Sequence, residues 1–402
     1  VARAEKIATM AITDPNCRDM ASVPAPSQTA GVAQLCLPTG SDTNPADPAN
    51  RVPDFGVSDV APNMFKAPFN VEAGAEQLSA AETARLTASG VNTLMMGLVA
   101  TNGVPFGTYL SKADYASMLT GNITDFGSIN PALAGKKVAI CRRVNGSGTQ
   151  ASYNWFFHNF PCSNGSIAGT GASTPLNVLS NIGTGSVIGG SGAAGDPLLL
   201  DPTAGVVIAE NAGSGDVRNC LKAANEGTDY SNSILFDDGS GTLSELHYTV
   251  KFSTSGVGTP AIGVLSLDSR GRESDDWTFR SLDGAGHIDP ATGNAVCDTP
   301  DKCGVAPTKA NLLAGDYEFS SELSMQYRNV PVNGVAAPSG NQLLFIQDFI
   351  KASGSPTVIE AIPSSGLRNA SAALPIAYPA SDASVADATR NGNMCQALEK
   401  KI

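Results

Sequence analysis

Apolar and polar positions alternate in blocks along the chain, and the blocks predict strands and helices in turn. Short apolar runs or β-like alternation predict strands at Val32–Leu37, Phe55–Val57, Val91–Ala100, Lys137–Cys141, Ala261–Leu267, Asp275–Leu282, Leu312–Val330 and Val358–Ile362. Helical spacing or caps predict helices at Ala2–Ile12, Ser79–Ala88, Ser111–Leu119, Gln150–Phe157, Val217–Ala224 and Leu343–Ala352, and a loosely helical tail over 367–402. Residues 163–204, rich in Gly, Ser and Ala, predict a long surface loop with short strands.

This alternation predicts an α/β fold with mostly parallel sheets flanked by helices. A chain of 402 residues is too long for one simple core and predicts two domains. With 42% hydrophobic and 15% charged residues, the composition is globular and rich in loops.

The net charge of −12 disfavours nucleic acid as a partner, because nucleic acid requires a basic surface. Any bound anion must be held by local donors, since the overall field repels it. No run is long enough to span a bilayer. The chain starts without Met or a signal peptide, and we expect a mature or trimmed form.

Eight cysteines without a Cys-x-x-Cys motif favour disulfides in an oxidising, periplasmic or extracellular compartment over zinc. We expect neither a metal nor a cofactor, and we expect the scattered His158, His247 and His287 at the surface or in loops. The pairings that we expect are Cys17–Cys36, Cys162–Cys220 and Cys297–Cys303, with Cys141 and Cys395 left open.

The most informative stretch runs from Lys136 to Phe157, where a strand leads through Arg142 and Arg143 into a glycine-rich turn and a helix. The first turn of a helix presents unpaired N–H groups and the positive end of the dipole. An arginine beside such a turn adds a planar fork for an oxyanion. The order therefore predicts an anion pocket, although Gly-Ser-Gly-Thr alone also fits an ordinary capped turn.

Asp59 follows the short strand at Phe55–Val57, where ligand-facing residues lie in open α/β sheets. Ser58 and Asp59 fit a helix cap or turn equally well.

Two motifs resemble segments of the phosphate-binding proteins of bacterial phosphate ABC transporters, which are type II periplasmic binding proteins. Phe55-Gly-Val-Ser-Asp-Val-Ala-Pro62 looks like the family's Gly-Ala-Ser-Asp-Ala-Pro, and Ile140–Thr149 looks like its Arg-Arg-x-Asp-Gly-Ser-Gly-Thr. The resemblance covers roughly residues 50–366, and the chain would be a divergent member. It implies two lobes that close on a ligand, with residues 1–100 and 328–402 in lobe one and residues 101–327 in lobe two. Hinge strands would then cross near Leu98–Asn102 and Leu323–Arg328.

Carried onto this chain, the resemblance implies that Arg143, Ser147, Gly148 and Thr149 hold phosphate and that Asp59 faces them. Asp59 would accept the proton that phosphate keeps, whereas sulfate has no proton to give. Asn145 stands where the family has aspartate. The implied function is a solute-binding protein without enzymatic activity, with phosphate or a similar oxyanion as ligand and an ABC transporter permease as partner.

The chain departs from the family before its first helix, where the family's first strand and loop have no counterpart. This leaves a sheet position that a neighbouring chain could fill, so an extracellular structural subunit that self-associates is the alternative. A hydrolase has weaker support, because the chain has neither a Gly-x-Ser-x-Gly elbow nor a metal constellation.

Overall fold

The computed structural model describes residues 54–162, 174–237, 243–273, 276–332, 336–362, 366–379 and 383–401. The elements that we predicted at Ala2–Ile12 and Val32–Leu37, and the Cys17–Cys36 pair, lie outside the described residues.

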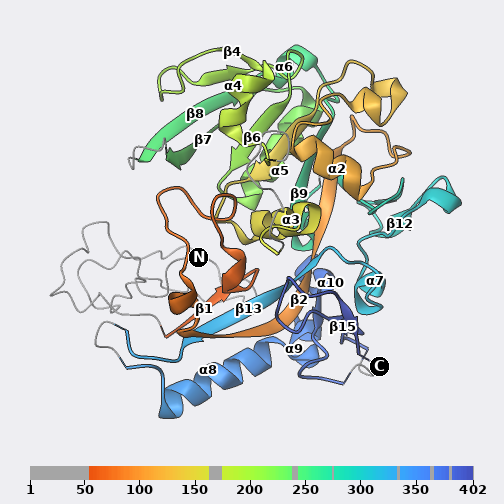
Figure 1. Ribbon diagram of the computed structural model, residues 1–402. Coiled ribbons are helices and arrows are strands. Elements are labelled where there is room, and N and C mark those ends of the chain that lie inside the picture. Colours follow the sequence, from red (N-terminus) through yellow and green to blue (C-terminus); the bar gives the residue numbers. More distant parts are fainter. Residues whose placement is uncertain are drawn as a thin grey trace, which may run out of the picture.

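Strands and helices alternate along the described chain (Figure 1). The strands are β1 Phe55–Ser58, β2 Leu86–Thr101, β3 Ala139–Arg143, β4 Val187–Gly189, β5 Leu198–Leu200, β6 Val207–Asn211, β7 Tyr230–Asp237, β8 Leu243–Val250, β9 Ala261–Ser266, β10 Trp277–Arg280, β11 His287–Ile288, β12 Ala295–Val296, β13 Ser320–Arg328, β14 Ser371–Ala373, β15 Ala388–Thr389 and β16 Glu399–Lys400. The α-helices are α1 Ala80–Thr83, α2 Lys112–Leu119, α3 Gly148–His158, α4 Asn181–Thr184, α5 Ser214–Glu226, α6 Phe252–Ser255, α7 Lys309–Leu313, α8 Gly340–Ser353, α9 Pro356–Ala361 and α10 Gly366–Ala370.

Strand β2 belongs to both halves of the main sheet. Its first part pairs with β13, up to Met95 opposite Ser320, and from Met96 onward it pairs with β9 and then also with β10. In Figure 1 it rises from the part of the molecule that holds β1, β13 and α8 toward the part that holds α3, α5 and β9. The lobe boundaries and hinge positions that we predicted stay predictions.

The α/β class is confirmed, but the expectation of mostly parallel sheets is wrong for the described strands. Only β3 with β6, β3 with β9, and β5 with β8 pair in parallel. All other described ladders are antiparallel, because β2 has antiparallel neighbours on both sides and β7–β8 is a hairpin. One contiguous apolar core joins β2, β3, β6 and β9 to α3 and α5.

Four element predictions need correction. The helix expected over Ser79–Ala88 ends at Thr83, and strand β2 begins at Leu86, because pairing with β13 outweighs local helix preference. The strand expected at Val358–Ile362 is helix α9, which starts with Pro356 at its first position. The tail contains the short strands β14, β15 and β16 rather than a loose helix, and the strand expected over Leu312–Val330 is limited to β13, because Lys309–Leu313 forms α7. The β7–β8 hairpin was not predicted.

The disulfides in the described residues join Cys141 to Cys220, Cys162 to Cys395 and Cys297 to Cys303. Cys297–Cys303 is confirmed, and the predicted Cys162–Cys220 pair is wrong. Cys141 on buried β3 lies next to Cys220 on the buried side of α5, a contact that depends on packing rather than spacing.

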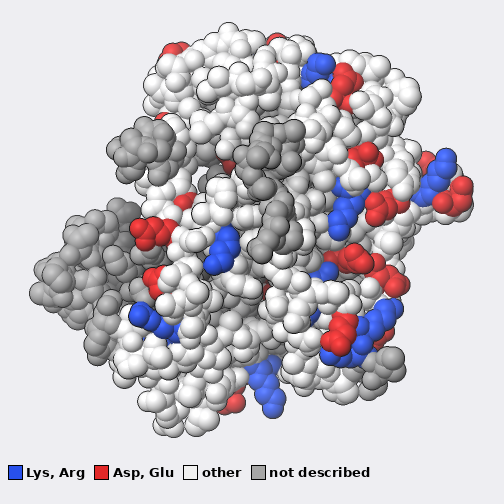
Figure 2. Space-filling view, viewed as in Figure 1, with Lys and Arg blue, Asp and Glu red and all other residues white. Residues whose placement is uncertain are grey.

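Charged groups are sparse on the face shown in Figure 2, where Lys and Arg are scattered among Asp and Glu rather than gathered in one patch. In the part of the chain that the structure describes, no helix has both the length and the apolar character needed to cross a membrane. Nor do His, Cys, Asp and Glu side chains of this part form a group that could hold a metal ion. His287 is buried on β11 and His158 is half-buried, so the expected surface positions are wrong for these two.

Candidate functional site

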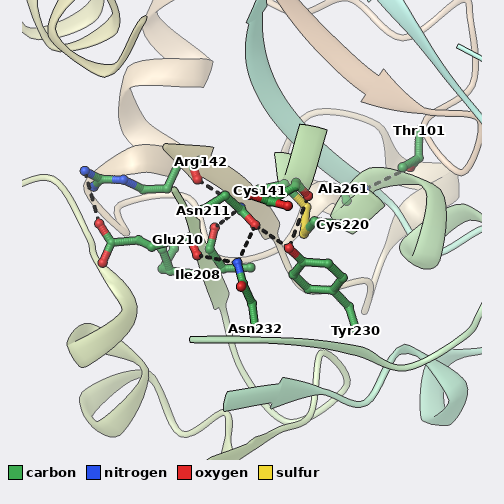
Figure 3. The surroundings of a disulfide bond; sticks show 12 residues. Thr101, Cys141, Arg142, Ile208, Glu210, Asn211, Cys220, Tyr230, Asn232 and Ala261 are labelled. Atoms are coloured by element: carbon green, nitrogen blue, oxygen red, sulfur yellow. Dashed lines mark hydrogen bonds and ion pairs between the residues drawn. A yellow bond between two sulfur atoms is a disulfide. The ribbon is translucent and has the colours of Figure 1, made fainter. Parts of the chain in front are cut away.

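The two arginines at the end of β3 have different surroundings because side chains alternate across a strand. Arg142 is 5% exposed and forms an ion pair with Glu210, with 3.5 Å between Nη2 and Oε1. Its Nη2 also donates to Asn145 Oδ1 at 2.9 Å. Figure 3 shows Arg142 and Glu210 facing each other beside the Cys141–Cys220 disulfide. This arginine is therefore part of the framework that fixes β3 and β6.

Arg143 is half-buried and is held by the start of α5. Its Nη1 donates to Ser214 Oγ at 2.9 Å, and its Nη2 donates to the carbonyl of Ala212 at 2.7 Å. Its Nε is buried and has no hydrogen-bond partner among the described residues. Burial lowers the pKa of Arg143, and the charges of Asp59 and Asp216 oppose that shift. Arg143 thus keeps an unsatisfied donor in a partly dry setting.

Helix α3 begins directly after the glycine-rich turn. Ser147 is the N-cap, and its Oγ accepts the N–H of Gln150 at 3.4 Å. Within the described part of the chain, neither the N–H of Gly148 nor that of Thr149 has a hydrogen-bond partner. These groups form the positive end of an 11-residue helix, which is the arrangement that favours an anion.

Asp59 lies directly against this helix end. A Cβ added to Gly148 would lie 2.6 Å from Asp59 Cβ and 2.8 Å from its Oδ2, so position 148 has no room for a side chain. Burial raises the pKa of Asp59, the charge of Arg143 opposes this, and the charge of Asp268 adds to it. The structure therefore brings together five of the six residues named from the motifs, although Asp59 and Gly148 are far apart in the sequence.

Asn145, the sixth residue, is occupied by contacts within the protein. Its Oδ1 accepts from Arg142, and its Nδ2 donates to the carbonyl of Pro68 at 3.3 Å. The amide therefore bridges the framework arginine and the segment that follows Asp59. A role for Asn145 as a ligand-binding residue stays a prediction.

Residues 59–75, which we call the strap, run along α3 from Gly148 to Asn154. Asn154 Nδ2 donates to the carbonyl of Phe69 at 3.1 Å and to Asn70 Oδ1 at 2.8 Å, and all three residues are buried. Gly146 is so close to Glu72 that an added Cβ would lie 2.7 Å from the Glu72 Cβ. The sequence did not predict the strap, because it is held by individual hydrogen bonds and close backbone approaches, which leave no periodic pattern in the sequence.

The space at this site is small. The described cavity bordered by both Arg143 and Thr149 has a volume of about 10 Å³ and lies among core side chains such as Tyr115 and Ile140. On the other side, Asp59 packs directly on Gly148 at the start of α3. We therefore expect that a phosphate-sized ion can reach the N–H groups of α3 only if the strap moves away from Gly148.

The anchor of Arg143 could have been found from the sequence. Gly213–Asp216 is a glycine-rich stretch directly before the helix predicted at Val217–Ala224. In the structure this segment begins α5 and supplies Ser214 to the guanidinium.

Several solved structures are similar to this chain. A phosphate ABC transporter substrate-binding protein from Clostridium perfringens, with bound phosphate, has a TM-score of 0.40 and 14% identity, and 77% of this chain and 76% of that chain are covered. An ABC-type phosphate transport receptor from Vibrio cholerae has a TM-score of 0.35 and 13% identity, with 77% and 78% covered. PstS from Borrelia burgdorferi has a TM-score of 0.33 and 11% identity, with 71% and 74% covered. No family model and no curated protein matches the chain.

Proposed function

We propose that the chain binds phosphate, or a similar tetrahedral oxyanion, at the N-terminus of α3. Arg143, Ser147, Gly148 and Thr149 would supply the donors, and Asp59 would face them. The observation that carries the proposal is the packing of Asp59 on Gly148, at a helix start with two N–H groups that have no partner among the described residues. Arg143, whose Nε is buried without a partner, acts on Asp59 through its charge.

The carboxylate gives the site a means to discriminate between anions. Phosphate keeps a proton near neutral pH and can donate it to Asp59, whereas sulfate would meet a repelling acceptor. Burial raises the pKa of Asp59, but Arg143 opposes the shift and favours the ionised acceptor. Sulfate has no proton to donate, so it would leave the Asp59 carboxylate without a hydrogen-bond donor, and such an unpaired buried group disfavours binding of the close analogue.

The proposal is binding without turnover. The strap must leave Gly148 to admit the ion and can return over it, which would seal the site from water. The three disulfides in the described residues support a location outside the cytoplasm. Transfer of the ion to an ABC transporter permease stays a prediction from the motif resemblance.

Calorimetric titration with phosphate and with sulfate tests the proposal. We expect saturable heat with phosphate and none with sulfate. Arg143→Met should weaken phosphate binding by roughly a hundredfold, because charged hydrogen bonds contribute about 1.5–3 kcal/mol each. Arg368→Met is the matched control, since Arg368 lies on α10 and forms an ion pair with Glu360 instead. Asp59→Asn should admit sulfate. A flat trace at millimolar phosphate with the folded chain would refute the proposal.

A subunit of an extracellular assembly is the second candidate function, and one surface favours it. Leu344 and Phe345 on α8 are 58% and 63% exposed, and Val57 on β1 is 58% exposed. Among the described strands, β1 pairs only with β13. A second copy could cover these side chains and extend the sheet at β1. Sedimentation of the wild type and of Phe345→Glu tests this candidate function. The wild type should self-associate, and Phe345→Glu should self-associate more weakly. A wild type that stays monomeric at high concentration would contradict it.

A further inference from the structure

A cavity of about 850 Å³ lies at the opposite end of α3 from Gly148. Its walls come from α2 and the residues just after it, from the C-terminal end of α3 and from residues 394–398. The Cys162–Cys395 disulfide holds that last segment close to α3, and Cys395 itself lines the cavity. This volume lies in the range of sites that bind small molecules.

Two positively charged side chains of the cavity wall make cation–π contacts with aromatic rings. Lys112 Nζ lies 3.8 Å from the ring centroid of Phe156, and Arg390 Cζ lies 4.6 Å from that of Trp155. The Phe156 ring also stacks on buried Phe319, with 4.5 Å between centroids and an interplanar angle of 17°. The rings are thus fixed by packing, and each holds its cation in place.

Neither cation is fully compensated within the described residues. Arg390 is 5% exposed, and its Nη2 donates to the carbonyl of Glu318 at 3.3 Å. Its Nε and Nη1 are buried without a hydrogen-bond partner, and no described carboxylate forms an ion pair with Arg390 or Lys112. Burial lowers the pKa of both Lys112 and Arg390, and this shift is opposed by the charges of Glu318 and Asp283 at Lys112 and of Glu322 and Glu318 at Arg390. The buried Arg390 still has two nitrogens without a hydrogen-bond partner among the described residues, and a bound anion would offset part of the cost of burying its charge.

Lys112 and Arg390 share the cavity wall with one acidic side chain, Glu318, and His158 is neutral because burial and the charge of Arg142 lower its pKa to about 4. Glu322 and Asp283 also act on the two cations from outside the wall. Polar and apolar side chains line the rest of the wall in similar measure, the apolar ones including Phe157, Met394 and Leu398. Carboxylates that already oppose the cations disfavour a small dianion, and a wall with both polar and apolar parts fits a monoanion with a hydrocarbon body.

We propose that this cavity binds an amphipathic carboxylate. Its carboxylate group would lie beside Lys112 and Arg390, and its hydrocarbon chain would lie against Phe157, Met394 and Leu398. The site is separate from the proposed oxyanion site, because the two lie at opposite ends of α3 and share none of the residues named for them.

Titration with decanoate, followed by calorimetry and by tryptophan fluorescence, tests this. The chain has two tryptophans, and only Trp155 lines the cavity, whereas Trp277 is 1% exposed on β10. We expect saturable heat and a saturable fluorescence change, and Trp155→Phe should remove the fluorescence change because it removes the only tryptophan that lines the cavity. Lys112→Met should weaken binding about tenfold or more, as expected for the loss of one ion pair. Lys222→Met, which removes an exposed lysine on α5, is the matched control and should leave binding unchanged.

Three results would overturn the proposal. The first is the absence of both heat and fluorescence change with millimolar decanoate. The second is equal binding of decanol, which lacks the charge, or equal weakening by the Lys112→Met and Lys222→Met substitutions. The third is displacement of decanoate by inorganic phosphate, which would show that Lys112 and Arg390 bind a small inorganic anion instead. Arg143→Met should leave decanoate binding intact, and loss of binding in that variant would also count against a separate site.

Discussion

The contact between Asp59 and Gly148 can be tested directly by giving position 148 a methyl group. In Gly148→Ala the new Cβ would lie 2.6 Å from Asp59 Cβ and 2.8 Å from Oδ2, and both distances are shorter than side-chain contacts allow. Gly148 does not have a positive φ, so the backbone itself accepts alanine. Any cost must therefore come from the contact with Asp59.

The expected cost is partly hidden by a gain. Overpacking by one methyl group costs about 1–3 kcal/mol. Alanine also favours a helix by up to about 1 kcal/mol relative to glycine. Gly148→Ala should thus change the free energy of unfolding by only about 0–2 kcal/mol, which is too ambiguous to interpret alone.

A double-mutant cycle separates the two terms. Asp59→Gly removes both atoms that the new methyl group would meet, whereas Asp59→Ala keeps the Cβ at 2.6 Å. We expect a coupling of about 1–2 kcal/mol between Gly148→Ala and Asp59→Gly, because the double variant escapes the clash. The coupling with Asp59→Ala should be clearly smaller.

Urea unfolding of the disulfide-intact variants, in buffer without phosphate, measures these free energies. Equal m-values across the set would confirm that only stability has changed. Additivity within about 0.5 kcal/mol in the Asp59→Gly cycle would refute the contact, and with it the basis for the proposed oxyanion site.

Three further predictions follow from burial and connectivity. Burial raises the pKa of Asp59 above its ordinary 3.8, so the folded state holds the carboxyl proton more tightly than the unfolded state. The free energy of unfolding should therefore fall as pH rises through the window above 3.8. Urea unfolding at pH 4 and pH 7 should show a weaker pH dependence for Asp59→Asn than for the wild type. Burial and the charge of Arg142 lower the pKa of His158 to about 4. The stability that depends on a neutral His158 should be complete above pH 6.5 and should be lost as pH falls toward 4. An NMR titration that places this pKa above 6 would contradict the burial of the side chain. Replacing Cys162 and Cys395 by serine opens a loop of 233 residues and should cost up to about 5 kcal/mol of unfolding free energy, and equal stability of variant and wild type in urea would contradict the link.

The local order of elements around the site was accessible from the sequence. The run before Arg142 is apolar enough to predict β3, and Ser147 and the glycines mark the start of α3. The residue pattern alone could not predict that Arg142 is buried against Glu210 while Arg143 acts on Asp59, because the choice depends on which face of β3 packs inward. Only the family resemblance singled out Arg143. Strand alternation predicts that the two arginines differ, but not which of them serves the framework.

Predictions failed where partners distant in the sequence decide the structure. Leu86 lies in a strand because β13 pairs with it, although the capping box at Ser79 favours a helix. Helix α9 shows the opposite error: Val358 and Ile359 favour a strand locally, but Ser355 and Pro356 form a helix start. The pairing of Cys141 with Cys220 required the packing of α5 on β3, which spacing along the chain does not contain.

The connections at the two ends of α3 limit how an oxyanion could reach its site. At the N-terminal end the strap contacts Gly146 and Gly148, and near the C-terminal end Cys162 is covalently bound to Cys395. A hinge motion that moves all of α3 away from the β1–β13 side would have to keep the short disulfide intact. A movement of the strap alone breaks only amide hydrogen bonds and packing contacts, which cost far less. Exchange of the ion should therefore depend on the strap more than on a rotation of whole lobes.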